Sequence, residues 1–366
     1  MLDFQYKKNV QFLRGLSVIF VFLYHTNIPC FQKGYLGVDI FFVISGFVIT
    51  QRIFQNYEID KKINLSEFYL KRFKRIIPNL VFIVSLTYVI YLLFGPPDLS
   101  LWNETISALL GVSNLYYIVH SIGYFDNVFD DPLAHTWSLG VEEQFYLFYP
   151  FLIFSIFSLS KNKILNLQIT LILIFFISLF FFKSQIETNP VFGFYLSPLR
   201  FWELIFGGIL FLNAYRIKKN NTLSYISLII IIFLVFSGYE YNYFYLNLII
   251  VLLSGLFIVS FSRSKFIENG VFVYFGNISY SFYLWHLPIL FFLDLYVVNN
   301  FYLDVILSFI FTTFFSVVTY KFIEQKFRYF KFKEIKKFII SGISIFLIVL
   351  TSLIYIRYFE NSLRAK

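Results

Sequence analysis

Two ionisable side chains, Arg14 and His25, lie inside the first long apolar stretch of the chain. An ionisable residue within a hydrocarbon layer is costly, so it normally faces a protein interior or a water-filled site. The eleven-residue spacing corresponds to three turns of helix, which puts both side chains on one face, about 16 Å apart along the axis. One predicted helix therefore presents a permanent cation near one end and a titratable base near the other.

Further polar side chains at or inside apolar stretches supply the other candidates for chemistry. They are arginines (Arg72, Arg75), histidines (His135, His286) and carboxylates (Asp39, Glu142, Glu143). A carboxylate beside a histidine orients the ring and raises its basicity, as a general base requires. Arginines bind phosphate or diphosphate through charge-assisted, often bidentate hydrogen bonds. The set suits a reaction between a phosphate-bearing donor and an acceptor that must lose a proton.

The composition places these residues in a membrane protein. Of the 366 residues, 58% are hydrophobic and 14% are charged, whereas a soluble domain carries about 25% charge. The net charge of +9 does not indicate nucleic-acid binding, because the basic residues gather in loops between apolar stretches. The single cysteine, Cys30, excludes an internal disulfide and a cysteine-based metal cluster. We therefore predict an all-α, polytopic helical bundle.

Eleven apolar stretches are long enough to cross about 30 Å of hydrocarbon as helices. They cover residues 10–28, 34–53, 77–95, 139–160, 164–182, 199–215, 222–239, 245–262, 275–297, 302–322 and 338–358. Residues 105–119 are predicted to form a re-entrant or interfacial helix on the outer side, because counting them as a span would invert every later loop. The first stretch is not a cleaved signal peptide, since it contains Arg14 and His25 and lacks a small-residue cleavage site.

Loop charges predict the orientation. With the N-terminus in the cytoplasm, the inside loops hold most of the 30 Lys and Arg, and the longest outside loop contains several aspartates, including Asp126, Asp130 and Asp131. The C-terminus is then extracytoplasmic. This topology places His25, Asp39, His135, Glu142 and Glu143 toward the outer side, His286 about midway, and Arg14, Arg72, Arg75, Glu324 and Arg328 toward the cytoplasm.

The charged candidates also have structural interpretations. Arg72 and Arg75 could anchor a helix at the membrane boundary. Asp39 could pair with a lysine or arginine for stability alone. Glu142 and Glu143 stand at a predicted helix terminus, where one of them could cap the helix or face water.

The histidines and one serine have comparable alternatives. His135 lies at a loop edge, His286 could pack between helices, and His120 has no motif around it. Ser45 is interpreted as a packing serine. The histidines lack the close spacing of metal ligands, such as H-x3-H, so neither a metal nor a tightly bound cofactor is predicted. The sequence also contains no P-loop, dinucleotide fingerprint or G-x-S-x-G elbow.

Six strings occur in an order that resembles the acyltransferase 3 family, the membrane O-acyltransferases of the O-antigen acetylase type. They are RGLSVIFVFLYH, GYLGVDIFFVISGFVIT, FYLKRFKRIIP, HTWSLGVEEQFYLFYP, FGNISYSFYLWHLP and KFIEQKFR. The family's Arg/Lys-x10-His motif matches Arg14 and His25, and its R-x-x-R motif matches Arg72 and Arg75. Its H-T-W-S-L-x-V-E-E-Q-F element matches residues 135–145. The resemblance covers roughly residues 10–330.

The resemblance implies a bacterial inner-membrane enzyme with a ten-helix acyltransferase domain over residues 1–330. It implies a cytoplasmic acyl-CoA donor, commonly acetyl-CoA, and a carbohydrate acceptor on the outer side, such as O-antigen lipopolysaccharide, exopolysaccharide or peptidoglycan. Residues 331–366 would form a basic cytoplasmic linker, an eleventh transmembrane helix and a short extracytoplasmic tail. The strings also resemble a subgroup in which an SGNH hydrolase-like domain follows that helix. Only residues 359–366 follow that helix and no G-D-S string occurs, so either the sequence stops before such a domain or the natural chain lacks it. A separate SGNH-type protein is a candidate partner.

The implied activity assigns roles to the arginines and histidines. Arg72 and Arg75 would dock the phosphates of acyl-CoA, with Arg14 deeper in the channel. His25 would act as general base on an acceptor hydroxyl, or would receive the acyl group covalently. His286 or a backbone amide would stabilise the oxyanion.

The remaining assignments concern the carboxylates and the substrate. Glu143 or Asp39 is expected to orient the His25 ring. The predicted substrate-binding residues are His135, Trp137, Glu142 and Trp285. Two other functions stay open: a transporter or flippase for a lipid-linked glycan would work without coenzyme A, and a membrane scaffold would tolerate polar replacement of Arg14 and His25.

Overall fold

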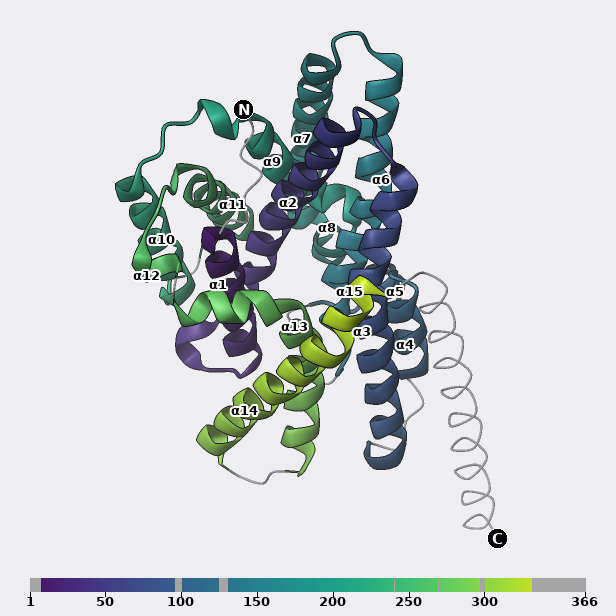
Figure 1. The fold of residues 1–366 in the computed structure, drawn as a ribbon. Coiled ribbons are helices and arrows are strands. Elements are labelled where there is room, and N and C mark those ends of the chain that lie inside the picture. The colour runs from purple at the N-terminus through teal and green to yellow at the C-terminus, as the bar shows by residue number, and fades with distance from the viewer. Residues whose placement is uncertain are drawn as a thin grey trace.

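The computed structural model describes residues 8–95, 101–124, 131–239, 241–268, 270–296 and 300–330, and the predicted helix at 338–358 lies outside this part. Within it the elements are helical and no strand occurs (Figure 1). The long helices are α1 (Lys8–His25), α2 (Gly37–Asp60), α3 (Leu65–Phe94), α6 (Thr136–Leu159), α7 (Lys163–Thr188), α9 (Ser197–Asn213), α10 (Asn221–Phe236), α11 (Tyr243–Ser260), α13 (Val271–Tyr296) and α14 (Phe301–Thr319). The predicted all-α polytopic membrane bundle is confirmed.

Seven helical stretches in the described part are long and apolar enough to cross a membrane. α1 and α6 are not among these and carry the polar residues of the first and fourth predicted spans, and α10 has only 16 residues. On α7 and α14 most side chains of the apolar segment point outward. Exposed apolar helix faces of this kind suit contact with lipid. The chain is therefore a multi-pass membrane protein whose polar residues are concentrated in particular helices.

The segment 105–119 differs from the prediction of a single helix. α4 (Leu101–Leu109) and α5 (Ser113–Val119) are separated by a turn at Gly111, whose φ of 68° favours glycine. At 1.5 Å per residue, these helices rise about 14 Å and 10 Å. Neither is long enough to cross a membrane, which agrees with leaving this segment out of the predicted spans.

α3 begins well before the predicted start at residue 77. The Asn64 side chain caps it by accepting a hydrogen bond from the Glu67 backbone N–H at 3.1 Å. The helix then continues to Phe94. Arg72 and Arg75 consequently lie within a helix rather than in a loop, and their spacing of three residues places them on neighbouring positions of its surface.

α1 packs most extensively against α13, and α2 packs against α9. At the α1–α13 crossing, a Cβ at Gly15 would lie within 3.0 Å of the Phe272 carbonyl oxygen, and one at Gly276 within 3.0 Å of the Gln11 carbonyl oxygen. Small residues allow membrane helices to approach this closely. The contact matters for the site because α1 ends at His25 and α13 contains His286.

The Gly276→Ala variant is expected to be less stable by about 1–3 kcal/mol, since the added methyl group must push α1 away from α13. The midpoint of thermal unfolding in detergent measures the effect. Gly238→Ala is the matched control, because a Cβ at Gly238 would meet nothing within 4 Å. Equal midpoints for the two variants would contradict a close-packed crossing.

Candidate active site

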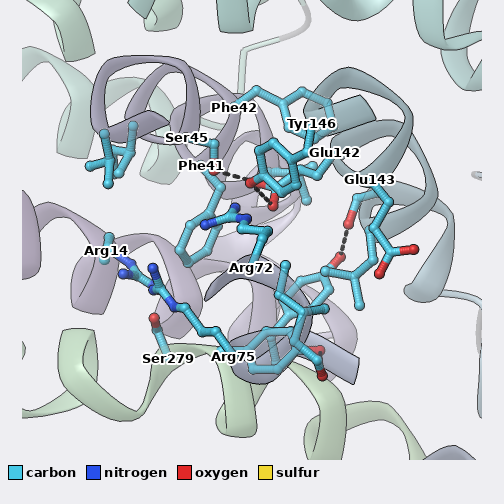
Figure 2. A pocket seen from close by; sticks show the side chains of 18 residues that line it. Arg14, Phe41, Phe42, Ser45, Arg72, Arg75, Glu142, Glu143, Tyr146 and Ser279 are labelled. Carbon is cyan, nitrogen blue, oxygen red and sulfur yellow. Dashed lines mark hydrogen bonds between the residues drawn. The ribbon is translucent and has the colours of Figure 1, made fainter. Parts of the chain in front are cut away.

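A pocket with a cavity volume of about 80 Å³ lies between α1, α2, α3, α6 and α13 (Figure 2). Its wall combines apolar side chains with charged ones. The charged lining residues are Arg14, Arg72, Arg75, Glu142 and Glu143. The structure therefore brings together all three predicted donor-binding arginines, which come from α1 and α3.

The guanidinium groups of Arg14 and Arg75 point toward one another in Figure 2. Glu324, which ends the π-helix Tyr320–Glu324, also lies near this pair, but its carboxylate already accepts hydrogen bonds from Ser281 and Arg328, each at 3.2 Å. Two adjacent guanidinium groups repel each other unless an anion lies between them. This end of the pocket is therefore suited to a phosphate or diphosphate.

Arg72 occupies a different part of the pocket. Its guanidinium carbon lies 3.7 Å from the centre of the Tyr146 ring, which is a cation–π contact. Its Nε–H is buried and has no hydrogen-bond partner in the described part of the chain. A buried donor without a partner is costly, so Arg72 is poised to bind an acceptor atom supplied by a ligand.

The carboxylates Glu142 and Glu143 lie in this arginine pocket and not beside the histidines. Glu142 accepts hydrogen bonds from Ser45 Oγ at 2.7 Å and from the Tyr146 hydroxyl at 2.5 Å. Ser45 is therefore a pocket residue, which corrects its interpretation as a packing serine. Glu143 lines the same pocket, so its position does not support the predicted role of orienting His25.

Three histidines form a second cluster next to the pocket. His286 Nε2 lies 3.2 Å from His25 Nδ1, and the His135 ring centre lies 5.0 Å from that of His286. All three are buried. In the described part, no group of three or more His, Cys, Asp or Glu has the arrangement of a metal site. The structure thus unites three histidines that are separated by more than a hundred residues along the chain.

Tyr283 of α13 forms a wall shared by the pocket and the histidine cluster. Its ring lines the pocket, and its hydroxyl is hydrogen-bonded to Ser138 Oγ at 2.7 Å and to the His135 carbonyl at 2.9 Å. Its own carbonyl accepts a hydrogen bond from His286 Nδ1 at 2.5 Å. Tyr283 therefore contacts both the pocket and the histidine cluster.

Asp39 belongs to a separate buried ion cluster. Arg200 Nη2 donates to Asp39, and Arg200 Nε donates to Glu203 at 2.8 Å. Arg200 Nη1 also donates to the Phe194 carbonyl at 3.2 Å. The exposed fractions of Asp39, Arg200 and Glu203 are 1%, 0% and 0%. This position supports the alternative that Asp39 pairs with an arginine, and it does not support the predicted role of orienting His25.

The two predicted tryptophan contacts differ in position. Trp137 is buried, its ring lies 5.8 Å from that of Tyr124, and its Nε1–H has no partner in the described part. Trp285 points toward α14, where its Nε1–H donates to Thr319 at 3.2 Å and its ring lies 5.2 Å from that of Phe315. The structure places Trp137 near the histidines and does not bring Trp285 to the pocket.

Several residues that shape the site are absent from the set predicted from the sequence. Arg200 and Glu203 are ionisable residues three positions apart inside an apolar stretch, which is the same signal that selected Arg14. Tyr283 precedes His286 by three positions and so lies on a neighbouring face of one helix. No sequence signal distinguishes Ser45 or Tyr146 from other polar residues in apolar helices.

Comparison with known proteins relates the chain to acyltransferases. A family model described as an acyltransferase domain, that of the acyltransferase 3 family, matches residues 7–321. The O-acetyltransferase OatA proteins of Staphylococcus aureus strains NCTC 8325 / PS 47 and COL are each 30% identical over 352 residues, covering 88% of this chain and 57% of their own length. The chain thus spans somewhat more than half the length of these curated relatives. No solved structure matches it.

Proposed function

The chain belongs to the acyltransferase 3 family, and on that premise we propose that it transfers an acyl group from acyl-CoA to a hydroxyl of a cell-surface carbohydrate. The acyl group is acetyl, as the name of the OatA relatives suggests. The observation that carries the proposal is that α1 extends from the arginine pocket to the histidine cluster, with Arg14 at one and His25 at the other. One rigid helix can therefore bind the donor phosphates and position the base.

The donor enters with its phosphates at the arginines. Arg14 and Arg75 bind the diphosphate, and Arg72 supplies its unpartnered Nε–H to a further oxygen. The pantetheine arm then runs along the apolar wall toward Tyr283. His25 follows Arg14 by eleven positions in α1, so the arm must cover about 16 Å.

The reaction itself takes place at the histidine cluster. His25 removes the proton from the acceptor hydroxyl as its oxygen attacks the thioester carbonyl carbon. The carbon–sulfur bond breaks, and the sulfur leaves with the proton that His25 held. His135, whose two buried ring nitrogens have no hydrogen-bond partner in the described part, is the candidate to contact the carbonyl oxygen or the acceptor.

A covalent route through an acyl group on His25 uses the same residues. The two routes differ in one observable. Rapid release of free coenzyme A, stoichiometric with enzyme and independent of acceptor, supports the covalent route. Its absence supports direct transfer.

The proposed setting is the bacterial inner membrane, with the N-terminus cytoplasmic and the C-terminus extracytoplasmic. Donor acyl-CoA is cytoplasmic, and the acceptor is an O-antigen, exopolysaccharide or peptidoglycan glycan on the outer side. A separate SGNH-type protein is retained as a candidate partner for choosing the acceptor.

The function is tested by the ester-linked acetyl content of the surface polysaccharide in a wild-type and a deletion strain. Inside-out membrane vesicles from the same strains, supplied with acetyl-CoA radiolabelled in the acetyl group, give the transfer rate directly. We expect both measurements to fall in the deletion strain. Unchanged acetyl in both would contradict the proposal and favour the transporter or flippase interpretation, which requires no coenzyme A.

The Arg72→Ala variant is expected to raise KM for acetyl-CoA by about 10–100-fold, because a hydrogen bond to a charged group contributes about 1.5–3 kcal/mol. Initial rates in the vesicles at varied acetyl-CoA measure it. Arg216→Ala is the matched control, since Arg216 is exposed and lies outside the pocket. An unchanged KM for Arg72→Ala would show that the donor phosphates bind elsewhere.

A further inference from the structure

The tautomer of His286 is determined by the group that its Nδ1 faces. His286 Nδ1 lies 2.5 Å from the Tyr283 carbonyl oxygen, three residues earlier in α13. A carbonyl oxygen can only accept a hydrogen bond, so Nδ1 of His286 must carry the proton. In a neutral imidazole the other nitrogen, Nε2, then holds the lone pair.

That assignment determines the tautomer of His25 in turn. His286 Nε2, an acceptor, lies 3.2 Å from His25 Nδ1. His25 Nδ1 must therefore be the donor in this contact. The lone pair of His25 is then on Nε2.

A hydroxyl group already occupies the place in front of this lone pair. The Tyr124 hydroxyl lies 3.4 Å from His25 Nε2. It is a buried O–H group next to the basic nitrogen, which is the relation that an acceptor sugar hydroxyl needs before it is deprotonated. The Tyr124 hydroxyl thus marks the position that the acceptor hydroxyl would take.

Neither of the two carboxylates expected to orient His25, Asp39 and Glu143, is placed to do so. Asp39 is held by Arg200, and Glu143 lines the arginine pocket. Beside many catalytic histidines, an aspartate or glutamate accepts a hydrogen bond from the ring and so orients it. In this site His286 is placed to accept that hydrogen bond from His25, and its own ring is anchored by the Tyr283 backbone carbonyl.

We propose that His286 is the positioning residue of His25: by accepting the Nδ1–H of His25, it keeps the lone pair on Nε2, facing the acceptor hydroxyl. This inference rests on the proposed acyl transfer. The acceptor O–H gives its proton to His25 Nε2, the oxygen forms the ester bond to the acyl carbon, and the carbon–sulfur bond breaks. The coenzyme A sulfur then takes the proton from Nε2, while Nδ1–H stays bonded to His286.

The test compares two substitutions of His286 whose side-chain carbonyl oxygens reach different positions of the former imidazole ring. Gln at position 286 places a carbonyl oxygen near the former Nε2, where it can accept from His25, whereas Asn reaches only the former Nδ1 position. Transfer is measured in inside-out vesicles from the producing strain, which contain the native acceptor, with radiolabelled acetyl-CoA. We expect His286→Gln to keep kcat within about tenfold of wild type and His286→Asn to lose about 10²-fold, with KM for acetyl-CoA within about twofold in both.

Controls separate this inference from the proposed function. His120→Asn changes an exposed histidine outside the cluster and is expected to leave kcat unchanged. Acetyl-CoA binding by each purified variant shows that the pocket is folded, and His286→Leu, which cannot accept a hydrogen bond, replaces the Asn variant if the latter does not accumulate. In a His25→Ala background, His286→Asn is expected to cause no further loss of transfer.

The outcomes are distinct. If wild type transfers no acyl group, the proposed function itself is wrong. If wild type transfers and His25→Ala does not, but the Gln and Asn variants at position 286 are equally active or equally inactive, the positioning role is overturned while acyl transfer stands. An additional loss in the His25→Ala background would overturn it as well.

Discussion

Replacing His25 with alanine is expected to lower the rate of acyl transfer by about 10³-fold, since general-base catalysis contributes about 10²–10⁴-fold. His25 is buried at the meeting point of α1 and α13, within hydrogen-bond distance of His286, where the proposed base is held in place. The rate is measured in inside-out vesicles, and the ester-linked acetyl content of the surface polysaccharide is measured in the same cells.

Two comparisons make this result specific. His120→Ala removes an exposed histidine at the C-terminal end of α5 and is expected to leave the rate of acyl transfer unchanged. The KM for acetyl-CoA of His25→Ala is expected to stay near that of wild type, because the proposed site of the donor phosphates is the arginine pocket and not the histidine cluster. Transfer at the wild-type rate in His25→Ala would remove the base from the mechanism.

Replacing Arg200 with methionine is expected to lower the free energy of unfolding by about 3–5 kcal/mol, the cost of leaving a buried charge without its partner. Arg200 is fully buried between Asp39 of α2 and Glu203 of α9, and it donates to both. Without it, two carboxylates would stay in the interior of the bundle. Thermal unfolding in detergent, calibrated against a chemical denaturant, measures the loss.

A combined variant tests whether the charge is the cause. With Arg200→Met, the changes Asp39→Asn and Glu203→Gln remove the two carboxylate charges and are expected to restore much of the stability, because replacing a whole buried ion cluster is often nearly neutral. Arg216→Met, at an exposed arginine, is the control for loss of a guanidinium group in general. A loss in the combined variant as large as in Arg200→Met would show that side-chain packing, not charge, is responsible.

Local patterns in the sequence were sufficient to predict most of the long helices and to place Arg14 and His25 on one of them. Stretches of about twenty apolar residues predicted the spans, and the eleven-residue spacing of Arg14 and His25 placed them on one helix. α1 runs without interruption from Lys8 to His25, so both residues do belong to it. These features depend on helix geometry and on transfer of apolar residues into lipid, and both act over neighbouring residues.

The boundaries of two helical segments differ from those predicted from the sequence. α3 starts at the Asn64 cap, although a charged segment precedes its apolar part, and residues 105–119 are divided by the turn at Gly111. Hydropathy reports which residues can enter lipid and is insensitive to capping and to left-handed backbone positions.

The partners within the site were decided by the tertiary structure. His25 meets His286, which is 261 residues away, because glycines let α1 and α13 pack closely. Asp39 meets Arg200 and not a histidine, and Trp285 faces α14. By itself, the sequence determined which residues share one helix, since that is set by the backbone repeat. Only the packing of helices far apart in the chain decided which of those residues meet, because burial and close contact are properties of the whole bundle.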